Sequence, residues 1–146
     1  MSIDDDVALL ERVPTLRLLG HTALRMLAIG SEQRDFDRGD VLFTAGDEAD
    51  AGYIVQRGSF QVEEGGAEMI AGPGALIGEL ALIVAMKRPS NATALERSSV
   101  IRIARSLFQR VLESDPTAAR RLRDELATRT SQLASDILMA GAKLST

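Results

Sequence analysis

The hydrophobic positions of the chain change their spacing twice. Over residues 1–31 they recur at helical intervals, as in the run HTALRMLAIG that ends at Gly30. From 33 to 103 they stand in short alternating runs separated by glycines, and from 105 to 143 the helical intervals return. The pattern predicts N-terminal helices, a β-rich middle and C-terminal helices within a single domain that covers residues 1–146.

The predicted middle consists of many short strands. The strand candidates are Val41/Phe43, Phe60/Val62 and Val100 to Ile103. Turn glycines stand at Gly39-Asp40, Gly46-Asp47 and Gly58, and EEGGAE reads as a hairpin loop between FQVEE and EMIA. Short strands at such intervals predict a double-stranded β-helix or jelly-roll-like β-roll. With helices before it and a long helix after it, the fold class is α+β, mainly β.

Two helices are predicted after the last strand. Ser106 is the predicted N-cap of the first, and Leu107, Val111 and Leu112 share one of its faces. Asp115-Pro116 begins the second, because aspartate at the N-cap followed by proline is a strong start signal. No helix breaker follows before Gly141, so the second helix is expected to run about 25 residues.

An apolar stripe follows the second helix at alternating steps of three and four. Its members are Ala119, Leu122, Leu126, Leu133, Ile137, Ala140 and Leu144. Arg129 occupies a position at which the repeat calls for an apolar residue. About half of the stripe is expected to lack an intramolecular partner. The helix either lies on its own β-roll, or it pairs with its copy in a homodimer or moves over a ligand.

Composition restricts the classes of function. Hydrophobic residues make up 45% of the 146 and charged residues 26%, which is typical of a folded globular protein. The net charge of −4 opposes duplex DNA as the main partner. Cysteine is absent, the chain starts with MSIDDD, and no apolar run approaches the ~18 residues of a membrane span. These features predict a cytoplasmic protein without a membrane span.

The single histidine of the chain argues against an enzyme. His21 is the only histidine, and it lies in the helical N-terminal part. A metal enzyme built on a β-roll needs several histidine ligands with a carboxylate, and a serine nucleophile needs a base. The chain is therefore predicted not to be an enzyme and to hold neither a metal nor a cofactor.

The stretch IGELALIVAMKRPSNATA, residues 77–94, carries the candidate chemistry. Arg88 suits a phosphate because its planar donor fork matches two phosphate oxygens. A turn at Gly78 would add backbone N–H groups and allow close approach of the anion. Glu79 would then accept a hydrogen bond from a sugar hydroxyl. The alternative is an ordinary surface ion pair between Glu79 and Arg88, worth at most ~1 kcal/mol.

These residues resemble a known family. The series Gly78-Glu79-Leu80-Ala81-Leu82, Arg88, Ala92-Thr93 is similar to the phosphate-binding cassette of the cyclic nucleotide-binding domains of catabolite activators, cyclic-nucleotide-regulated kinases and gated channels. The motif residues that agree upstream are Phe36, Gly39-Asp40, Leu42-Phe43, Gly46-Asp47, Tyr53-Ile54, Gly58 and Val62. The resemblance covers roughly residues 10–140. It implies a site in which Gly78 and the amides of Leu80 and Ala81 hold the cyclic phosphate, Glu79 takes the ribose 2′-hydroxyl, and Arg88 pairs with a phosphate oxygen.

The tail of the cassette departs from the family pattern. Pro89, Ser90 and Asn91 stand between Arg88 and Ala92, which makes the tail longer than usual. In the family a serine or threonine just after the arginine can favour cGMP or add a phosphate contact. Ser90 is a candidate for this role, but Pro89 holds the adjacent position and offers neither a hydroxyl nor an N–H. The sequence therefore favours cAMP over cGMP. The predicted ligand-binding residues are Gly78, Glu79, Leu80, Ala81, Arg88, Pro89, Ser90, Asn91 and Ala92.

The predicted function is a sensor that binds cAMP or cGMP and transmits occupancy through its C-terminal helices to an unknown effector protein. Thr130 and Ser131 are candidate base contacts in the long helix, with apolar cover from Leu133, Ile137 and Leu138. The chain stops at Thr146 without room for a helix-turn-helix, so direct DNA binding is not expected. The alternative is a ligand-free structural, dimerisation or protein-interaction module that retains the fold, which the longer cassette tail would favour.

Overall fold

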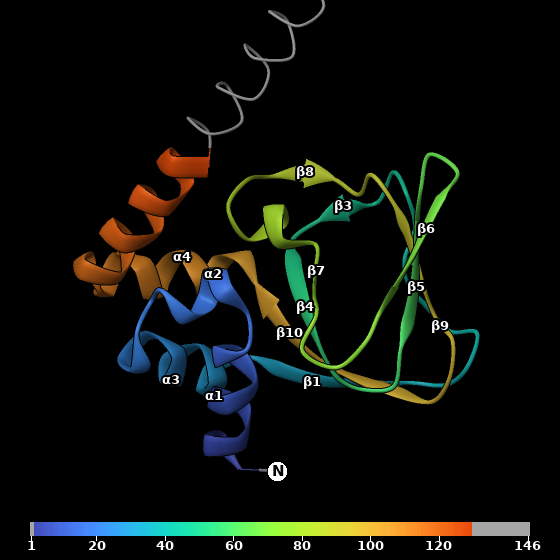
Figure 1. Cartoon of the computed structure of the whole chain (residues 1–146), viewed down its shortest axis with the longest axis horizontal. Coiled ribbons are helices and arrows are strands. Elements are labelled where there is room, and N and C mark those ends of the chain that lie inside the picture. Colours follow the sequence, from blue (N-terminus) through green and yellow to red (C-terminus); the bar gives the residue numbers. More distant parts are fainter. Residues whose placement is uncertain (1, 130–146) are drawn as a thin grey trace, which may run out of the picture.

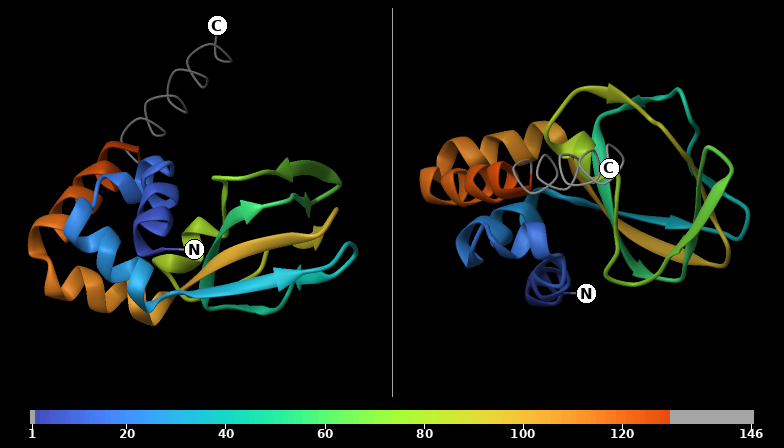
Figure 2. Two further views of the ribbon diagram at one scale, coloured as in Figure 1. Left: turned by 90° about the horizontal axis from the view of Figure 1, so that it is seen from below. Right: turned by 45° about the horizontal axis from the view of Figure 1, so that its top comes forward.

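The computed structural model describes residues 2–129 of the chain. The strands wind into a roll, and the helices gather at one end of it (Figure 1). Figure 2 shows the same separation from two other directions, with helices and strands in two distinct halves. None of the helices within 2–129 is long and apolar enough to cross a membrane.

The helices precede and follow the strands, as the spacing predicts. Their bounds are α1 Ile3–Glu11, α2 Pro14–Arg17, α3 His21–Gly30 and α4 Arg105–Ser114, with a further helical stretch at 116–129. The prediction that Gly30 ends its helix is confirmed. A side chain at Gly30 would place its Cβ 2.6 Å from Leu107 Cδ1, so this glycine also allows α3 and α4 to approach closely.

The strands form two four-stranded antiparallel sheets and one short pair. Their bounds are β1 Glu32–Phe36, β2 Val41–Phe43, β3 Glu48–Ala49, β4 Ala51–Arg57, β5 Phe60–Glu64, β6 Ala67–Ala71, β7 Leu76–Ile77, β8 Met86–Lys87, β9 Asn91–Ala94 and β10 Ser98–Ala104. One sheet has the order β1-β10-β4-β7, the other β2-β9-β5-β6, and β3 pairs with β8. The hairpin predicted at EEGGAE joins β5 to β6, with positive φ at Gly65 and Gly66. The predicted β-roll and the α+β class are confirmed.

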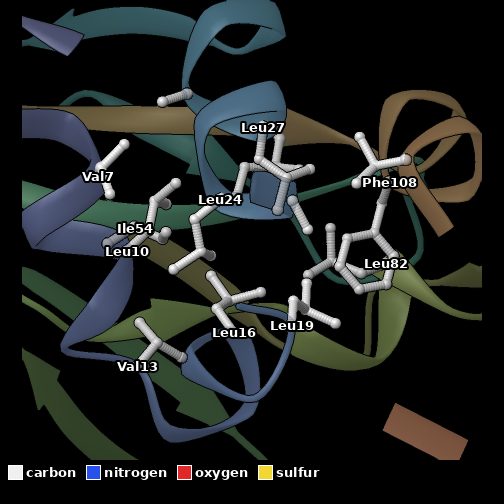
Figure 3. Close-up of a cluster of buried hydrophobic side chains, with 14 of the residues drawn as sticks. Val7, Leu10, Val13, Leu16, Leu19, Leu24, Leu27, Ile54, Leu82 and Phe108 are labelled. Carbon is white, nitrogen blue, oxygen red and sulfur yellow. The ribbon is translucent and has the colours of Figure 1, made fainter. Parts of the chain in front are cut away.

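The sheet β1-β10-β4-β7 separates two hydrophobic cores. Strand β4 is buried along most of its length because both of its faces are covered. Tyr53 and Val55 point into the roll, whereas Ile54 points to the helices. The labelled side chains of Figure 3 show how Ile54 and Leu82 meet leucines from α1, α2 and α3. The helices are thus tied by packing to the outer face of the roll.

The predicted N-cap of α4 is wrong. The helix begins at Arg105, and Ala104 stands at the N-cap in an extended conformation without a side-chain cap. Strand β10 runs directly into the helix, and the backbone carbonyl of Asp50 accepts the N–H of Arg105 at 2.8 Å. The Asp50 carbonyl, between β3 and β4, thus accepts the first amide of the helix, and Ser106 lies inside the first turn instead of at the cap.

The helix after Asp115 begins as predicted and packs on the chain's own helices. Asp115 Oδ1 accepts the N–H of Ala118 at 3.1 Å, which confirms the aspartate as N-cap. Of the predicted stripe, Leu122 is buried in the helical-side core and Leu126 packs against it, whereas the buried alanine is Ala118 and not the predicted Ala119. This part of the helix therefore has an intramolecular partner, a core that the helices form with the outer face of the sheet. Thr130, Ser131 and the stripe from Leu133 to Leu144 lie outside the described residues.

Candidate functional site

A cavity of about 330 Å³ opens in the roll beside the short helix η1 (Glu79–Leu82). Its volume is at the lower end of the range for small-molecule sites. Strands β2, β3, β5, β6, β7 and β8, helix η1 and residues 88–90 contribute to its walls. The predicted site residues that line it are Gly78, Glu79, Leu80, Ala81, Arg88, Pro89 and Ser90. Two predicted residues, Asn91 and Ala92, are not part of the lining.

Gly78 brings the backbone and Arg88 together at one end of the cavity. Its φ of 77° and ψ of 37° lie in the left-handed region, which favours glycine. A Cβ at this position would stand 2.6 Å from Arg88 Nη1. The Ala81 N–H already donates to the Gly78 carbonyl at 3.1 Å, whereas the Leu80 N–H has no backbone acceptor among residues 2–129. Gly78 is thus required both for the turn and for the approach of the guanidinium.

The Arg88 side chain is buried at this end, with only 5% of the residue exposed. Its Nη2 donates to the Ala51 carbonyl at 2.8 Å, and its Cζ lies 4.3 Å from the centre of the Phe43 ring. Burial lowers the pKa of the guanidinium, although Tyr53 and Asp50 oppose this shift. Arginine stays protonated at neutral pH, so a positive charge is held inside the roll. Within residues 2–129, no carboxylate forms an ion pair with Arg88, and its buried Nε has no hydrogen-bond partner.

The two Gly-Asp motifs of the sequence hold the two ends of the cassette tail. Gly46 N–H donates to the Arg88 carbonyl at 2.9 Å, and Arg88 N–H donates to the Asp47 carbonyl at 2.7 Å. Gly39 and Asp40 make the same pair of bonds with Ala94, at 2.8 and 2.9 Å. In each turn the aspartate side chain also accepts a backbone N–H three residues upstream. The Gly46-Asp47 turn therefore fixes the backbone from which the Arg88 side chain extends.

The residues after Arg88 lead from the cavity wall into strand β9. Pro89 is exposed and Ser90 is buried in the wall, and then β9 begins. Asn91 Oδ1 accepts the Ala45 N–H at 2.8 Å, and Ala92 is fully buried opposite Phe43 and Val62. The extra residues of the tail thus lie in the cavity wall and at the start of β9, and they do not fill the cavity beside Arg88.

Glu79 occupies the other side of the cavity and interacts with two helical segments. Thr15 Oγ1, in α2, donates to Glu79 Oε1 at 2.7 Å. Arg129 Nη1 donates to the same oxygen at 3.2 Å. The alternative of an ion pair between Glu79 and Arg88 is not found in the described part of the chain, since the arginine bound to Glu79 is Arg129.

A second arginine secures the segment between Glu79 and Arg88. Arg105 Nη1 donates to the carbonyls of Ala49, Ala81 and Val84, at 2.7, 3.3 and 3.2 Å. Because Arg105 is the first residue of α4, it connects that helix to the end of η1 and to β3. In Figure 2, η1 lies at the junction of the helical half and the roll.

The rest of the cavity wall is apolar. Val62, Leu76 and Ile77 line it, and Met69 and Ile70 stand at its opening with 65% and 69% of each residue exposed. Charged and apolar walls thus face one space, an arrangement that suits an anion attached to a flat apolar group. Nowhere in residues 2–129 do three histidine, cysteine, aspartate or glutamate side chains gather as a metal would require.

The roles of five residues at the site were not predicted from the sequence. Phe43 and Tyr53 match motif positions, but nothing in the sequence indicates that their rings lie against Arg88. No sequence pattern indicates that Arg105 binds the carbonyls beside the cavity. Thr15 follows a proline in a short helix and likewise gave no signal. Arg129 did give one, because it interrupts the apolar stripe of its helix. That break has a physical reason in the structure, since Arg129 reaches Glu79.

Comparisons with known proteins agree with this geometry. A family model described as the cyclic nucleotide-binding domain matches residues 33–115. The chain is 37% identical over 111 residues to an uncharacterized NTE family protein of Mycobacterium bovis, and the match covers 73% of this chain and 19% of that protein. The chain spans about a quarter or less of the first curated relatives that it matches, 26% and 19% of their lengths.

Two solved structures show the same fold. A cyclic nucleotide-binding-like protein from Brucella abortus is 37% identical, with a TM-score of 0.67 over 75% of this chain and 99% of that one. The N-terminal domain of a transcriptional regulator from Streptomyces coelicolor is 27% identical, with a TM-score of 0.80 over 88% and 94% of the two chains.

Proposed function

The chain belongs to the cyclic nucleotide-binding domain family, and on that premise we propose that its cavity binds a cyclic nucleotide as a regulatory sensor, without catalysing a reaction. The preferred ligand is cAMP over cGMP. The support for this preference is Pro89, which follows Arg88 and has neither a hydroxyl nor an N–H to offer a guanine base.

The observation that carries the proposal is the buried, unpaired charge of Arg88. Moving a charged group out of water is costly unless an opposite charge and hydrogen bonds compensate it. Arg88 is 5% exposed and forms no ion pair with any described carboxylate. An anion that enters the cavity beside Gly78 would supply this compensation. A cyclic phosphate fits because it is a singly charged anion with two free oxygens for the guanidinium fork.

The rest of the nucleotide follows from the shape of the cavity. With the phosphate at Gly78, the Leu80 amide and Arg88, the ribose hydroxyl meets Glu79. The base then lies against the apolar wall that contains Val62 and Ile70. Thr130 and Ser131 stay predicted base contacts of the segment outside the described residues.

Signal transmission requires that the nucleotide binds one arrangement of the helices better than another. Glu79 and Arg105 are the candidate links, because each connects the cavity to a helix at the end of the roll. A homodimer through the helix after Asp115, an effector protein and a cytoplasmic location stay predictions of the sequence. In the alternative, a ligand-free interaction module, the buried Arg88 charge would have only the Ala51 carbonyl and two aromatic rings as direct partners and no ion pair to offset its desolvation.

A calorimetric titration with cAMP and cGMP tests the proposal. We expect binding of both nucleotides, with the lower dissociation constant for cAMP, and loss of measurable binding in Arg88→Ala. Arg110→Ala is the matched control, because Arg110 is an exposed arginine of α4 away from the cavity lining. Mass spectrometry of ligand released from the denatured protein ensures that the sample is free of copurified nucleotide. Absence of binding to a folded, nucleotide-free sample would contradict the proposal.

A further inference from the structure

We propose that Thr15 and Arg129 are positioning residues for ribose recognition. Both bind one oxygen of Glu79, which leaves the other oxygen for the 2′-hydroxyl of the nucleotide. The inference rests on the proposed function, because it concerns how the same cavity recognises its ligand. It assigns a role in nucleotide binding to two side chains from segments outside the cassette.

The three side chains form a closed triangle of hydrogen bonds. Thr15 Oγ1 donates to Glu79 Oε1 at 2.7 Å, and Arg129 Nη1 donates to the same oxygen at 3.2 Å. Arg129 Nη2 donates to Thr15 Oγ1 at 2.8 Å. The hydroxyl of Thr15 thus uses its one hydrogen towards the carboxylate and one lone pair towards the guanidinium. Threonine supplies both functions, because a hydroxyl is donor and acceptor at once.

The lone pairs of Glu79 explain why this arrangement serves a ligand. A carboxylate has two oxygens with about four acceptor sites in total. Oε1 accepts from Thr15 and Arg129, whereas Oε2 accepts no hydrogen bond from any residue within 2–129. Glu79 also lines the cavity. The triangle therefore fixes the rotamer of Glu79 and keeps one oxygen available to the ribose.

The burial of Thr15 supports a role beyond simple packing. Only 4% of the residue is exposed, and its hydroxyl lies at the edge of a core otherwise made of aliphatic and aromatic side chains. A buried hydroxyl is costly without hydrogen bonds, and here both bonds go to the site. A valine has nearly the same shape and would satisfy the packing of α2 alone.

The triangle also joins segments that are far apart in the sequence. Thr15 and Glu79 are separated by 64 residues, and Thr15 and Arg129 by 114. The N-terminal helix α2 and the helix after Asp115 thus meet at the ribose side of the cavity. Any shift of these helices relative to η1 would alter the orientation of the carboxylate.

The test compares cAMP with its 2′-deoxy analogue. In the unsubstituted protein we expect a lower dissociation constant for cAMP, because only cAMP donates to Glu79. Thr15→Val should raise the dissociation constant of cAMP by about 5- to 10-fold and leave that of the deoxy analogue nearly unchanged. This is less than the loss of a whole hydrogen bond to a charged group would give, because the bond from the ribose to Glu79 is weakened and not removed. Thr15→Ser should restore the preference. Thr22→Val, at an exposed threonine of α3, is the matched control.

Arg129→Met provides a second variant in case Thr15→Val does not fold. Its effect on the cAMP preference should be smaller, about 2- to 4-fold, because Arg129 is 45% exposed and water screens its charge. Arg123→Met, at an exposed arginine of the same helix, is its control. If these variants weaken the binding of cAMP and of its 2′-deoxy analogue equally, or leave the preference for cAMP unchanged, the positioning role would be overturned. A missing preference in the unsubstituted protein would overturn it too, whereas failure to bind either nucleotide would overturn the proposed function itself.

Discussion

The two sides of the cavity hold opposite charges in different ways. On the phosphate side, Arg88 is buried, its backbone is bonded to the Gly46-Asp47 turn, and its charge has no ion-pair partner among the described residues. On the ribose side, the Glu79 side chain is 38% exposed and is held by Thr15 and Arg129. Arg88 and the turn that holds it belong to the roll, whereas the two side chains that hold Glu79 come from helices.

This difference assigns two tasks to two regions. A buried, unpaired charge with a fixed backbone gives affinity for an anion, because the anion removes a desolvation cost already present. A partly exposed carboxylate in contact with separate helices gives less affinity, but its geometry changes when the helices move. The roll therefore supplies most of the affinity for the ligand. The helices couple binding to their own arrangement, because they hold the carboxylate that contacts the ribose.

Arg88→Met should have the largest effect on affinity and little effect on folding. Loss of a buried charge pair typically costs 2–5 kcal/mol, so the dissociation constant of cAMP should rise by about 30-fold to several thousand-fold. The free energy of unfolding without nucleotide should change by less than about 1 kcal/mol, because the lost bond to Ala51 is offset by the removed desolvation cost. Calorimetry and urea denaturation measure the two quantities. A large loss of stability in the nucleotide-free protein would show that Arg88 is structural and would erase the contrast with Glu79.

Gly78→Ala should damage the same side through sterics. The new Cβ would meet Arg88 Nη1 at 2.6 Å, and alanine at a φ of 77° is strained. We expect a loss of stability of about 1–2 kcal/mol and a rise of about 30-fold in the dissociation constant of cAMP, measured by urea denaturation and calorimetry.

The matched control for Gly78→Ala is Gly66→Ala, at the β5–β6 hairpin. Gly66 has a φ of 84°, and a Cβ added there would have no atom within 4 Å, so only the backbone strain is shared. A similar stability loss without an affinity loss is expected in this control. Equal affinity losses in both variants would mean that displacement of Arg88 is not the cause.

The sequence predicted the roll and the cavity residues because short-range patterns encode them. Alternating strands, turn glycines and the cassette spacing from Gly78 to Arg88 are all local, and the structure brings those residues to one cavity. The cap of α4 was missed because the carbonyl of Asp50, more than fifty residues away, satisfies the Arg105 amide. Contacts between distant segments leave no periodic signal.

The ribose side was harder to predict for the same reason. Thr15 meets Glu79 only after the helices have packed on the roll, so a threonine after a proline carried no information by itself. Arg129 was visible as an interruption of an apolar stripe, but its partner was not. A charged residue at a position that the repeat reserves for an apolar one therefore indicates a distant partner of opposite charge, without identifying it.

The two Gly-Asp turns allow a comparison within the roll. Asp47 and Asp40 make equivalent side-chain bonds, at 3.0 and 2.8 Å, but only the Asp47 turn holds Arg88. Asp47→Ala and Asp40→Ala should each lower the free energy of unfolding by about 1 kcal/mol. Only Asp47→Ala should also weaken cAMP binding, by about 3- to 5-fold, through looser placement of Arg88. Calorimetry on both variants checks this, and equal effects on affinity would contradict a local role for the Gly46-Asp47 turn.

The smallest effect is expected at Glu125, the second carboxylate that contacts Arg129. Glu125 Oε1 lies 3.5 Å from Arg129 Nε, and its side chain is as exposed as that of Glu79, at 38%. Glu125→Gln should change the free energy of unfolding by less than about 0.5 kcal/mol, because an exposed pair on one helix contributes little. The preference for cAMP over its 2′-deoxy analogue should stay unchanged in Glu125→Gln and be lost in Glu79→Gln. Loss of the preference for cAMP in Glu125→Gln would mean that the contact between Glu125 and Arg129 within one helix, and not the triangle with Thr15, orients Arg129 towards Glu79.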